Sequence, residues 1–177
     1  MLLDGDEWRR RFTEIRREAW RLETLPQYLV AHEAEEFAAF REGRPIAPYS
    51  TSPYTERVSR QRAEGKRNGR VHIVTQPLSD YLRFEFARYY EVHSRAGDDI
   101  RILDVTNRAN PLDKVQDFWL FDQAEVVLMN YEADGRQISR ELFDGDVSSF
   151  IEYQRVATAE SVPFEEYVNG GLRARPA

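Results

Sequence analysis

His72 is one of three histidines in the chain, and it lies in a strand pattern from which it could meet His93 across a sheet–helix interface. With Glu85 or Asp80 nearby, these side chains would form a metal site with two histidines and one carboxylate. However, the histidine spacings match no recognised metal motif, and structural histidines explain the pattern more simply. We therefore expect neither a metal nor a cofactor.

A polar cluster opens the helix that we predict over residues 78–95. The N-terminus of a helix favours anions, but Asp80 would repel one there, so this is not a phosphate site. Asp80 and Glu85 could act as a general acid and base if neighbouring charges separate their pKa values. Helix capping and ion pairing are the simpler interpretation. The cluster consists of Asp80, Tyr81, Arg83 and Glu85.

The most basic part of the chain is residues 56–70, where six basic and two acidic side chains give a net charge of +4. This stretch could bind phosphate groups of nucleic acid or an acidic protein partner. It contains no interleaved aromatic residues for base stacking, and a solvated helix face is the simpler interpretation. The candidate anion- or partner-binding residues are Arg57, Arg60, Arg67 and Arg70.

A short aromatic strand over residues 118–121 lies between Asp117 and Asp122. The alternation of a strand places Trp119 and Phe121 on one face. If that face were open, the two rings would form a docking patch for a partner or an aromatic ligand. Core packing on both faces is the alternative interpretation.

Composition excludes several classes of protein. The 177 residues carry a net charge of −6 and contain no cysteine, which rules out disulfide frameworks, thiol nucleophiles and cysteine-bound zinc. No phosphate-binding glycine loop, zinc-protease motif or hydrolase nucleophile elbow is present. Residues 1–97 carry 17 basic and 15 acidic groups, and residues 98–177 carry 8 and 16. An anion-binding face therefore belongs in the first half.

The N-terminus turns acidic at once and lacks the pattern of a signal peptide, and no apolar run could span a membrane. We therefore expect a cytoplasmic protein that does not bind membranes. The hydropathy pattern predicts helices over 6–18, 33–42, 55–66, 78–95 and 146–161, with a short one after Pro163. It predicts strands over 20–24, 70–76, 100–105, 118–121, 125–131 and 137–143.

These elements indicate an α+β fold. We expect a single domain over residues 1–170, with an antiparallel sheet of about five strands and helices packed on one face. The helices over 79–95 and 146–161 should cover that face, and Asp134-Gly135 should turn the last hairpin. Residues 171–177 would form a loose tail. The polar and aromatic segment over 44–54 could be a binding loop or a connector.

Three stretches carry a family resemblance: residues 77–85 (PLSDYLRFE), 117–122 (DFWLFD) and 162–167 (VPFEEY). Together they resemble an actinobacterial family of uncharacterised proteins with a domain of unknown function. Members of that family are often encoded beside helix-turn-helix regulators. The resemblance therefore implies a regulatory role exercised with a protein partner, and it implies no chemistry.

We expect a non-catalytic regulatory or interaction domain that acts with a helix-turn-helix regulator. The alternative is a small ribonuclease-like toxin or another enzyme, whose basic and proton-transferring residues would have to converge in one cleft. A third possibility is a small ligand bound between the sheet and the 44–54 loop. The candidate residues for the enzyme are Arg60, Arg67, His72, Arg83 and Glu85.

Overall fold

The fold is built on one mixed sheet in the computed structural model, which describes residues 1–173, with side chains for residues 1–170. Within this part, seven strands lie in the order β6-β5-β4-β1-β2-β3-β7. The strands are β1 (Glu18–Glu23), β2 (Arg67–Val74), β3 (Asp98–Asp104), β4 (Phe118–Phe121), β5 (Glu125–Tyr131), β6 (Gln137–Leu142) and β7 (Val162–Pro163).

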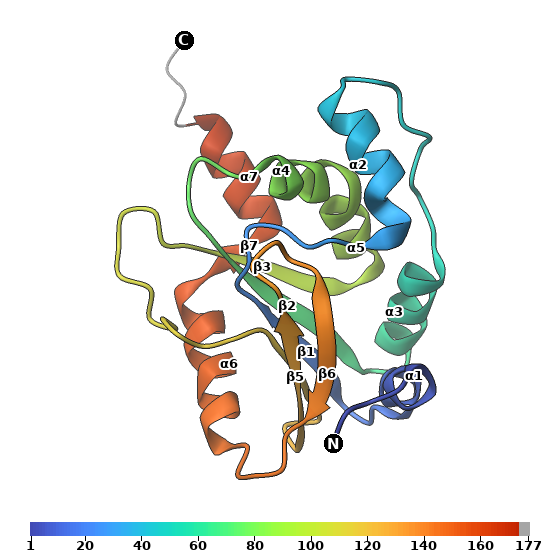
Figure 1. The fold of residues 1–177 in the computed structure, drawn as a ribbon, viewed down its shortest axis with the longest axis vertical. Coiled ribbons are helices and arrows are strands. Elements are labelled where there is room, and N and C mark those ends of the chain that lie inside the picture. Colours follow the sequence, from blue (N-terminus) through green and yellow to red (C-terminus); the bar gives the residue numbers. More distant parts are fainter. Residues whose placement is uncertain (174–177) are drawn as a thin grey trace.

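The helices connect and cover these strands (Figure 1). Ser79 caps α4 by accepting a hydrogen bond from the Leu82 amide at 3.0 Å, and η2 is a π-helical turn in the middle of one continuous helix. The helices are α1 (Gly5–Glu14), η1 (Ala31–Glu33), α2 (Ala34–Arg41), α3 (Pro53–Ala63), α4 (Asp80–Glu85), η2 (Phe86–Tyr90), α5 (Glu91–Ala96), α6 (Ser148–Glu160) and α7 (Phe164–Arg173).

The sheet is mixed, so the expected antiparallel sheet of about five strands is wrong. β1, β2 and β3 run parallel to one another. The physical reason lies in the connections. α2 and α3 lie between β1 and β2, and α4 to α5 lies between β2 and β3. Each of these helical connections crosses back over the sheet to the edge from which the preceding strand started. The next strand therefore runs in the same direction as the one before it.

The second half of the sheet is antiparallel. β4, β5 and β6 form the predicted meander, and β4 pairs antiparallel with β1 at the centre. Gly135 turns the hairpin between β5 and β6 with φ +89°, a backbone conformation that glycine adopts without strain. The two-residue β7 pairs antiparallel with β3, and α7 begins directly after its Pro163.

Helices cover both faces of the sheet, which also corrects the expected one-sided packing. Ala157 of α6 packs with Leu22, Val71 and Leu120 on one face. The helix from α4 to α5 packs with Ile100 and other residues of the opposite face, where α1 and α2 also lie. Because side chains alternate along a strand, each central strand contributes to both layers. Figure 1 shows α6 on one side of the sheet, away from α1 and α3.

The end of the chain is described in part. Residues 171–173 continue the backbone of α7, and residues 174–177 of the predicted tail lie outside the described residues. Across residues 1–173, no helix is both long and apolar enough to cross a membrane.

Candidate functional site

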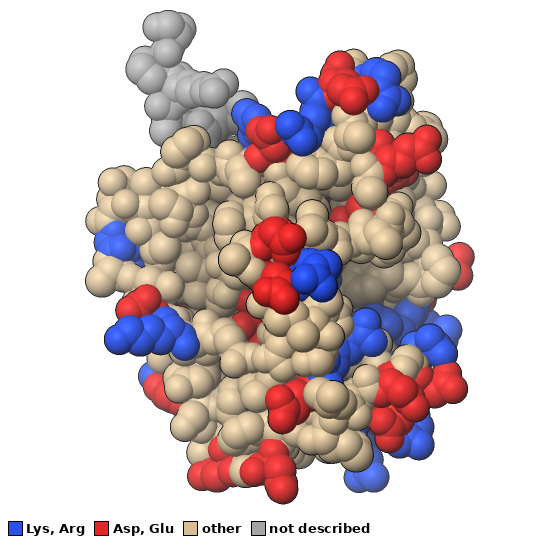
Figure 2. All heavy atoms as spheres, in the orientation of Figure 1, with Lys and Arg blue, Asp and Glu red and all other residues tan. Residues whose placement is uncertain are grey.

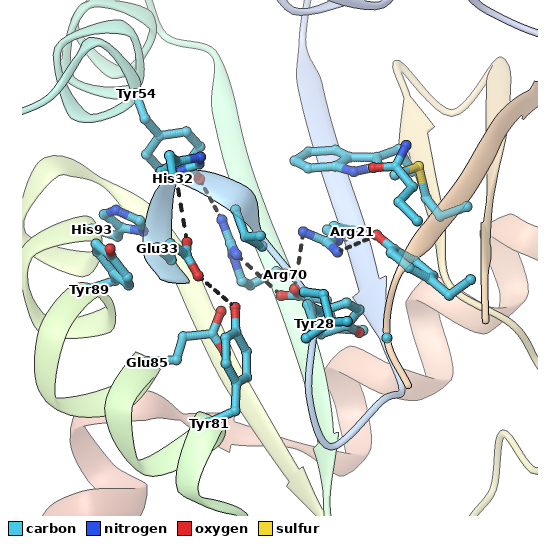
Figure 3. A pocket seen from close by; sticks show the side chains of 18 of the residues that line it. Arg21, Tyr28, His32, Glu33, Tyr54, Arg70, Tyr81, Glu85, Tyr89 and His93 are labelled. Carbon is cyan, nitrogen blue, oxygen red and sulfur yellow. Dashed lines mark hydrogen bonds and ion pairs between the residues drawn. The ribbon is translucent and has the colours of Figure 1, made fainter. Parts of the chain in front are cut away.

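A cavity of about 530 Å³ opens on the sheet face opposite α6. Its floor is formed by side chains of the strands β1, β2, β4, β5 and β6, and its walls come from the helices and loops that cover them (Figure 3). This volume falls within the range of small-molecule sites. We call this cavity the pocket. Its floor includes Arg21, Arg70, Trp119 and Tyr131, and its walls include Glu33, Tyr54, Tyr81, Glu85 and His93.

Two guanidinium groups share one buried carboxylate on the pocket floor. β1 and β2 pair in register, so that Arg21 lies beside Arg70. Arg70 donates to Glu23 at 3.2 Å, and Arg21 lies 3.0 Å from the other oxygen of the same carboxylate. Burial alone would raise the pKa of Glu23, but the two guanidinium groups outweigh it and lower the pKa to about 2. Glu23 is therefore ionised.

Arg70 is fully engaged by protein groups. Its Nε donates to Asp98 at 3.1 Å, and its Nη2 donates to the Tyr54 hydroxyl at 2.6 Å. Tyr54 in turn donates to Asp98 at 2.6 Å. Only 7% of the Arg70 side chain is exposed. Such a network fixes Tyr54 of α3 against the sheet and holds one wall of the pocket in place.

His72 follows Arg70 by two residues, on the same face of β2, and is completely buried. Its Nε2 donates to the carbonyl of Leu25 at 3.0 Å, because a carbonyl can only accept. Nδ1 therefore accepts from the Tyr90 hydroxyl, 2.7 Å away. Burial lowers the pKa of His72, so the ring is neutral and its tautomer is fixed by these two bonds.

Glu85 is the most unusual ionisable group of the pocket. Its Oε2 lies 3.6 Å from Nδ1 of His72 and has no hydrogen-bond partner, although 90% of the side chain is buried. Burial first, and then the negative charge of Glu23, raise the pKa of Glu85 well above its ordinary value. This raised pKa favours the protonated, neutral form of Glu85.

The turn that carries these groups is irregular. Glu85 ends α4, and the π-helical turn directly after it brings Tyr89 to the pocket and Tyr90 into the core beneath it. A π-helical turn inside an α-helix often marks a functional position, because it changes which side chains share a face. Here the π-helical turn places Tyr89 in the pocket lining and the next residue, Tyr90, in the buried hydrogen-bond network of His72.

A second carboxyl group lies near Glu85. Glu33, in η1, accepts a hydrogen bond from the Tyr81 hydroxyl at 2.9 Å, and burial raises its pKa. His93 of α5 faces the same end of the pocket. Burial, followed by the charge of Arg70, lowers the pKa of His93 to about 3, which leaves it neutral. This end of the pocket thus has two carboxyl groups, those of Glu33 and Glu85, and the exposed ring of His32 lies 3.9 Å from Glu33 (Figure 3).

Aromatic rings form much of the remaining wall. Tyr49 packs edge-on against Tyr89, with ring centroids 5.0 Å apart, and its hydroxyl lies 2.9 Å from Nε2 of His93. Tyr28 packs against Tyr131 with ring centroids 5.1 Å apart, and the guanidinium of Arg21 lies 5.2 Å from the centroid of the Tyr28 ring. The surface offered to a ligand is therefore aromatic between polar ends.

The loop after β1 closes the pocket on the hairpin side. Asp117 accepts from the Tyr28 hydroxyl at 2.5 Å and from the Thr24 amide at 2.9 Å. Leu29 donates its amide to the Gly135 carbonyl at 3.0 Å. A Cβ atom on Gly135 would lie only 2.4 Å from the Gln27 carbonyl, so this close approach requires glycine.

The structure divides the predicted helix-start cluster. Tyr81 and Glu85 point inward and line the pocket. Asp80 and Arg83 lie on the surface and pair with each other. Of the side chains proposed to surround His72, Glu85 lies 3.6 Å from it, whereas His93 contacts Tyr49 instead and Arg83 lies on the surface.

The predicted basic stretch is divided in the same way. Arg70 is buried in the network described above, and Arg57 packs over the ring of Phe12 at 4.4 Å. Arg60 is exposed, and the exposed Arg67 lies 3.2 Å from Glu18. Figure 2 shows basic and acidic side chains intermingled over α1, at the lower right of the view.

Trp119 and Phe121 lie beneath α1. They are 7% and 4% exposed, and the rings of Trp8 and Phe12 pack edge-on against them. Trp119 also lines the floor of the pocket. Across the described residues, no three His, Asp or Glu side chains lie close enough together to hold a metal ion.

Several pocket residues were not anticipated from the sequence, namely Arg21, Glu23, Tyr28 and Glu33. Two features of the sequence pointed toward the pocket. The alternation over residues 20–24 places Arg21 and Glu23 on one strand face. The polar and aromatic loop over 44–54 contains Tyr49, Ser52 and Tyr54, which all line the pocket.

Comparison with known proteins gives a family but no activity. No curated protein matches the chain. The family described as a domain of unknown function (DUF6879) matches residues 6–169, nearly the whole length, and the chain therefore belongs to this family.

Proposed function

We propose that this protein binds a small organic molecule in the pocket. One observation carries the proposal: charged and aromatic side chains converge on a 530 Å³ cavity, and some of their polar atoms have no partner. Six buried side-chain atoms of the described residues lack a hydrogen bond. Four of them belong to residues that line the pocket, namely Arg21, Glu85, His93 and Arg140.

Energetics support a ligand-binding role. A buried polar atom without a partner costs roughly 1–3 kcal/mol, and buried ion pairs are often no more stabilising than apolar residues of similar volume. Packing alone would therefore favour an apolar face of the kind that α6 covers. Concentrating this cost around one cavity is expected when a bound molecule supplies the missing contacts.

We further infer that a protein partner, a helix-turn-helix regulator, binds differently to the ligand-bound and ligand-free forms of this domain. The support is the sequence resemblance, whose relatives are often encoded beside such regulators. In this view the domain is a regulatory module whose occupancy changes how it contacts the regulator.

The arrangement of charges favours binding over the ribonuclease-like alternative. That alternative calls for basic residues and proton-transfer groups around one phosphate. His72 and Glu85 do meet, but His72 is completely buried. Arg60, Arg67 and Arg83 have exposed side chains and do not line the pocket.

The three tryptophans provide the test. Trp8 and Trp119 line the pocket, whereas Trp20 packs on the α6 face. In a ¹⁵N-labelled sample, a small-molecule library would be screened by the indole N–H signals. We expect compounds that shift the Trp8 and Trp119 signals and leave the Trp20 signal in place. If no library member gives this pattern, the small-molecule proposal is wrong.

A further inference from the structure

Some polar groups of the pocket have hydrogen-bond or ion-pair partners in the protein and others do not. This difference indicates which charge a ligand should carry. Two guanidinium groups of the floor are already neutralised, Arg70 by Glu23 and Asp98, and Arg21 by Glu23. Arg140 of β6, which also lines the pocket, has no carboxylate partner among the described residues and packs over the ring of Trp8 at 5.0 Å. Arg21 also donates to the Tyr131 hydroxyl at 3.2 Å. The positive charges of Arg21 and Arg70 therefore have little need of a ligand anion.

The carboxyl groups at the helical end are in the opposite situation. Oε2 of Glu85 has no hydrogen-bond partner in a side chain that is nine-tenths buried. Glu33 is held by the Tyr81 hydroxyl alone, apart from the exposed ring of His32 at 3.9 Å. Figure 3 shows the carboxyl groups of Glu33 and Glu85 pointing toward the same part of the cavity. At this end of the pocket, the carboxyl groups therefore lack hydrogen-bond donors, which an ammonium group would supply.

The surrounding rings suit a cation as well. Tyr81 and Tyr89 line this end of the pocket, and Tyr28 and Tyr49 pack against them at ring-centroid distances of 6.1 Å and 5.0 Å. The faces of aromatic rings attract ammonium groups, most strongly where water is excluded. The neutral imidazole of His93 adds no competing positive charge.

We propose that the pocket selects an organic amine, with its ammonium group placed between Glu33 and Glu85. This inference rests on the proposed ligand-binding function and names the ligand's chemical class. The aromatic wall would hold the body of such a molecule, and the two carboxyl groups would neutralise its charge.

Binding of an amine should release a proton. An ammonium beside Glu85 stabilises its carboxylate form and lowers its pKa toward the ordinary range, so the proton leaves to solvent as the ligand enters. The affinity should therefore rise with pH until Glu85 is ionised in the free protein. The charged and titratable groups that face Glu85 are Glu23 and Arg21 of β1, Arg70 and His72 of β2, Glu33 of η1, and Tyr81 and Tyr90 on its own helix.

The test compares three molecules that share one aromatic body. Tyramine carries an ammonium group, tyrosol carries a hydroxyl in its place, and 3-(4-hydroxyphenyl)propionate carries a carboxylate. We expect tyramine to shift the Trp8 and Trp119 indole signals and to bind at least tenfold more tightly than the other two. Calorimetry in two buffers of different ionisation enthalpy should detect the released proton.

Two variants assign the effect to one residue. Glu85→Gln should weaken tyramine binding at least tenfold, abolish the proton release and leave tyrosol binding unchanged. Asp80→Asn alters an exposed carboxylate of the same helix and should change none of these values. The proposal is overturned if tyrosol or the propionate binds in the pocket as tightly as tyramine.

The two proposals fail in different ways. If library compounds reach the pocket but amines show no preference, the ligand-binding function stands and the choice of an amine is wrong. If no compound of any charge shifts the Trp8 and Trp119 signals, both proposals are wrong.

Discussion

The two faces of the sheet are built by the same strands yet differ sharply in chemistry. β1 places Trp20 and Leu22 against α6, where the packing is apolar. The intervening Arg21 and Glu23 face the pocket, and Arg70 joins them from β2. The α6 face shows that this sheet can be covered by hydrophobic packing. The polar face is therefore better explained by binding than by stability.

The largest effect should come from breaking the ion pairs of the polar face. Arg70→Ala leaves Glu23 and Asp98 without their shared cation and should lower the free energy of unfolding by about 3–5 kcal/mol. Leu22→Ala on the apolar face should cost a comparable 2–5 kcal/mol, roughly, by leaving a cavity. Urea titration at neutral pH measures both values.

The dependence on pH separates these two losses. Glu23 has a folded pKa of about 2 against an ordinary 4.5, so it stabilises the fold above that ordinary value and loses this contribution as the pH falls toward 2. Without Arg70 the folded pKa of Glu23 rises, and the contribution shrinks. The deficit of Arg70→Ala should therefore diminish between neutral pH and about pH 3. The deficit of Leu22→Ala should stay constant, and a parallel decline in both variants would contradict the ionic explanation.

A smaller effect should follow from filling the close contact at the pocket wall. Gly135→Ala combines a positive φ of +89° with a Cβ atom 2.4 Å from the Gln27 carbonyl, and it should cost roughly 2–3 kcal/mol. The matched control is Gly65→Ala, where φ is +78° and no atom lies within 4 Å of the added Cβ. We expect about 1 kcal/mol there. Thermal unfolding measures the loss of stability in both variants. Equal losses would contradict the close contact, because they would show that the loop at Gln27 moves to accommodate the added methyl group.

Removing the proton-binding group of the pocket should stabilise the protein. The pKa of Glu85 is higher in the folded state than in the unfolded state, so its contribution is present below about pH 4.5 and is lost as the pH rises. Each pH unit in this window weakens the fold by at most about 1.4 kcal/mol. Glu85→Gln removes this loss. Its stability should exceed that of the wild type at pH 8 and approach it near pH 4, and a constant difference would contradict the raised pKa.

Much of the local structure follows from the sequence, but the order of the strands does not. The alternation over 118–121 and 125–131 predicts β4 and β5, and Asp134-Gly135 predicts their turn to β6. Periodicity reports which side chains share a face, not which strands are neighbours. The parallel centre was nevertheless implied, because the predicted helices over 33–42, 55–66 and 78–95 separate the first three strands.

The site is less predictable for a related reason. Arg21 and Glu23 alternate with apolar residues, which is typical of a strand with one solvated face. Whether such a face is open depends on what covers it, and here the cover comes from Glu33, Tyr54 and Glu85 on three separate helices. Residue types alone identified His72 and Glu85 as candidates. Their common neighbour Glu23, which shifts the pKa of Glu85, emerges only from the tertiary structure.

The smallest effect should come from the exposed part of the basic stretch, which contrasts with buried Arg70. Arg60 and Arg67 are exposed, so Arg60→Ala with Arg67→Ala should change the free energy of unfolding by no more than about 0.5 kcal/mol. Tyramine binding should also stay the same, because neither residue lines the pocket. If this stretch grips DNA, each lost phosphate contact should reduce the slope of log affinity against log salt by about 0.9. A double variant with an unchanged slope would exclude nucleic-acid contact through Arg60 and Arg67, and would leave the buried arginine network as the feature that distinguishes this part of the chain.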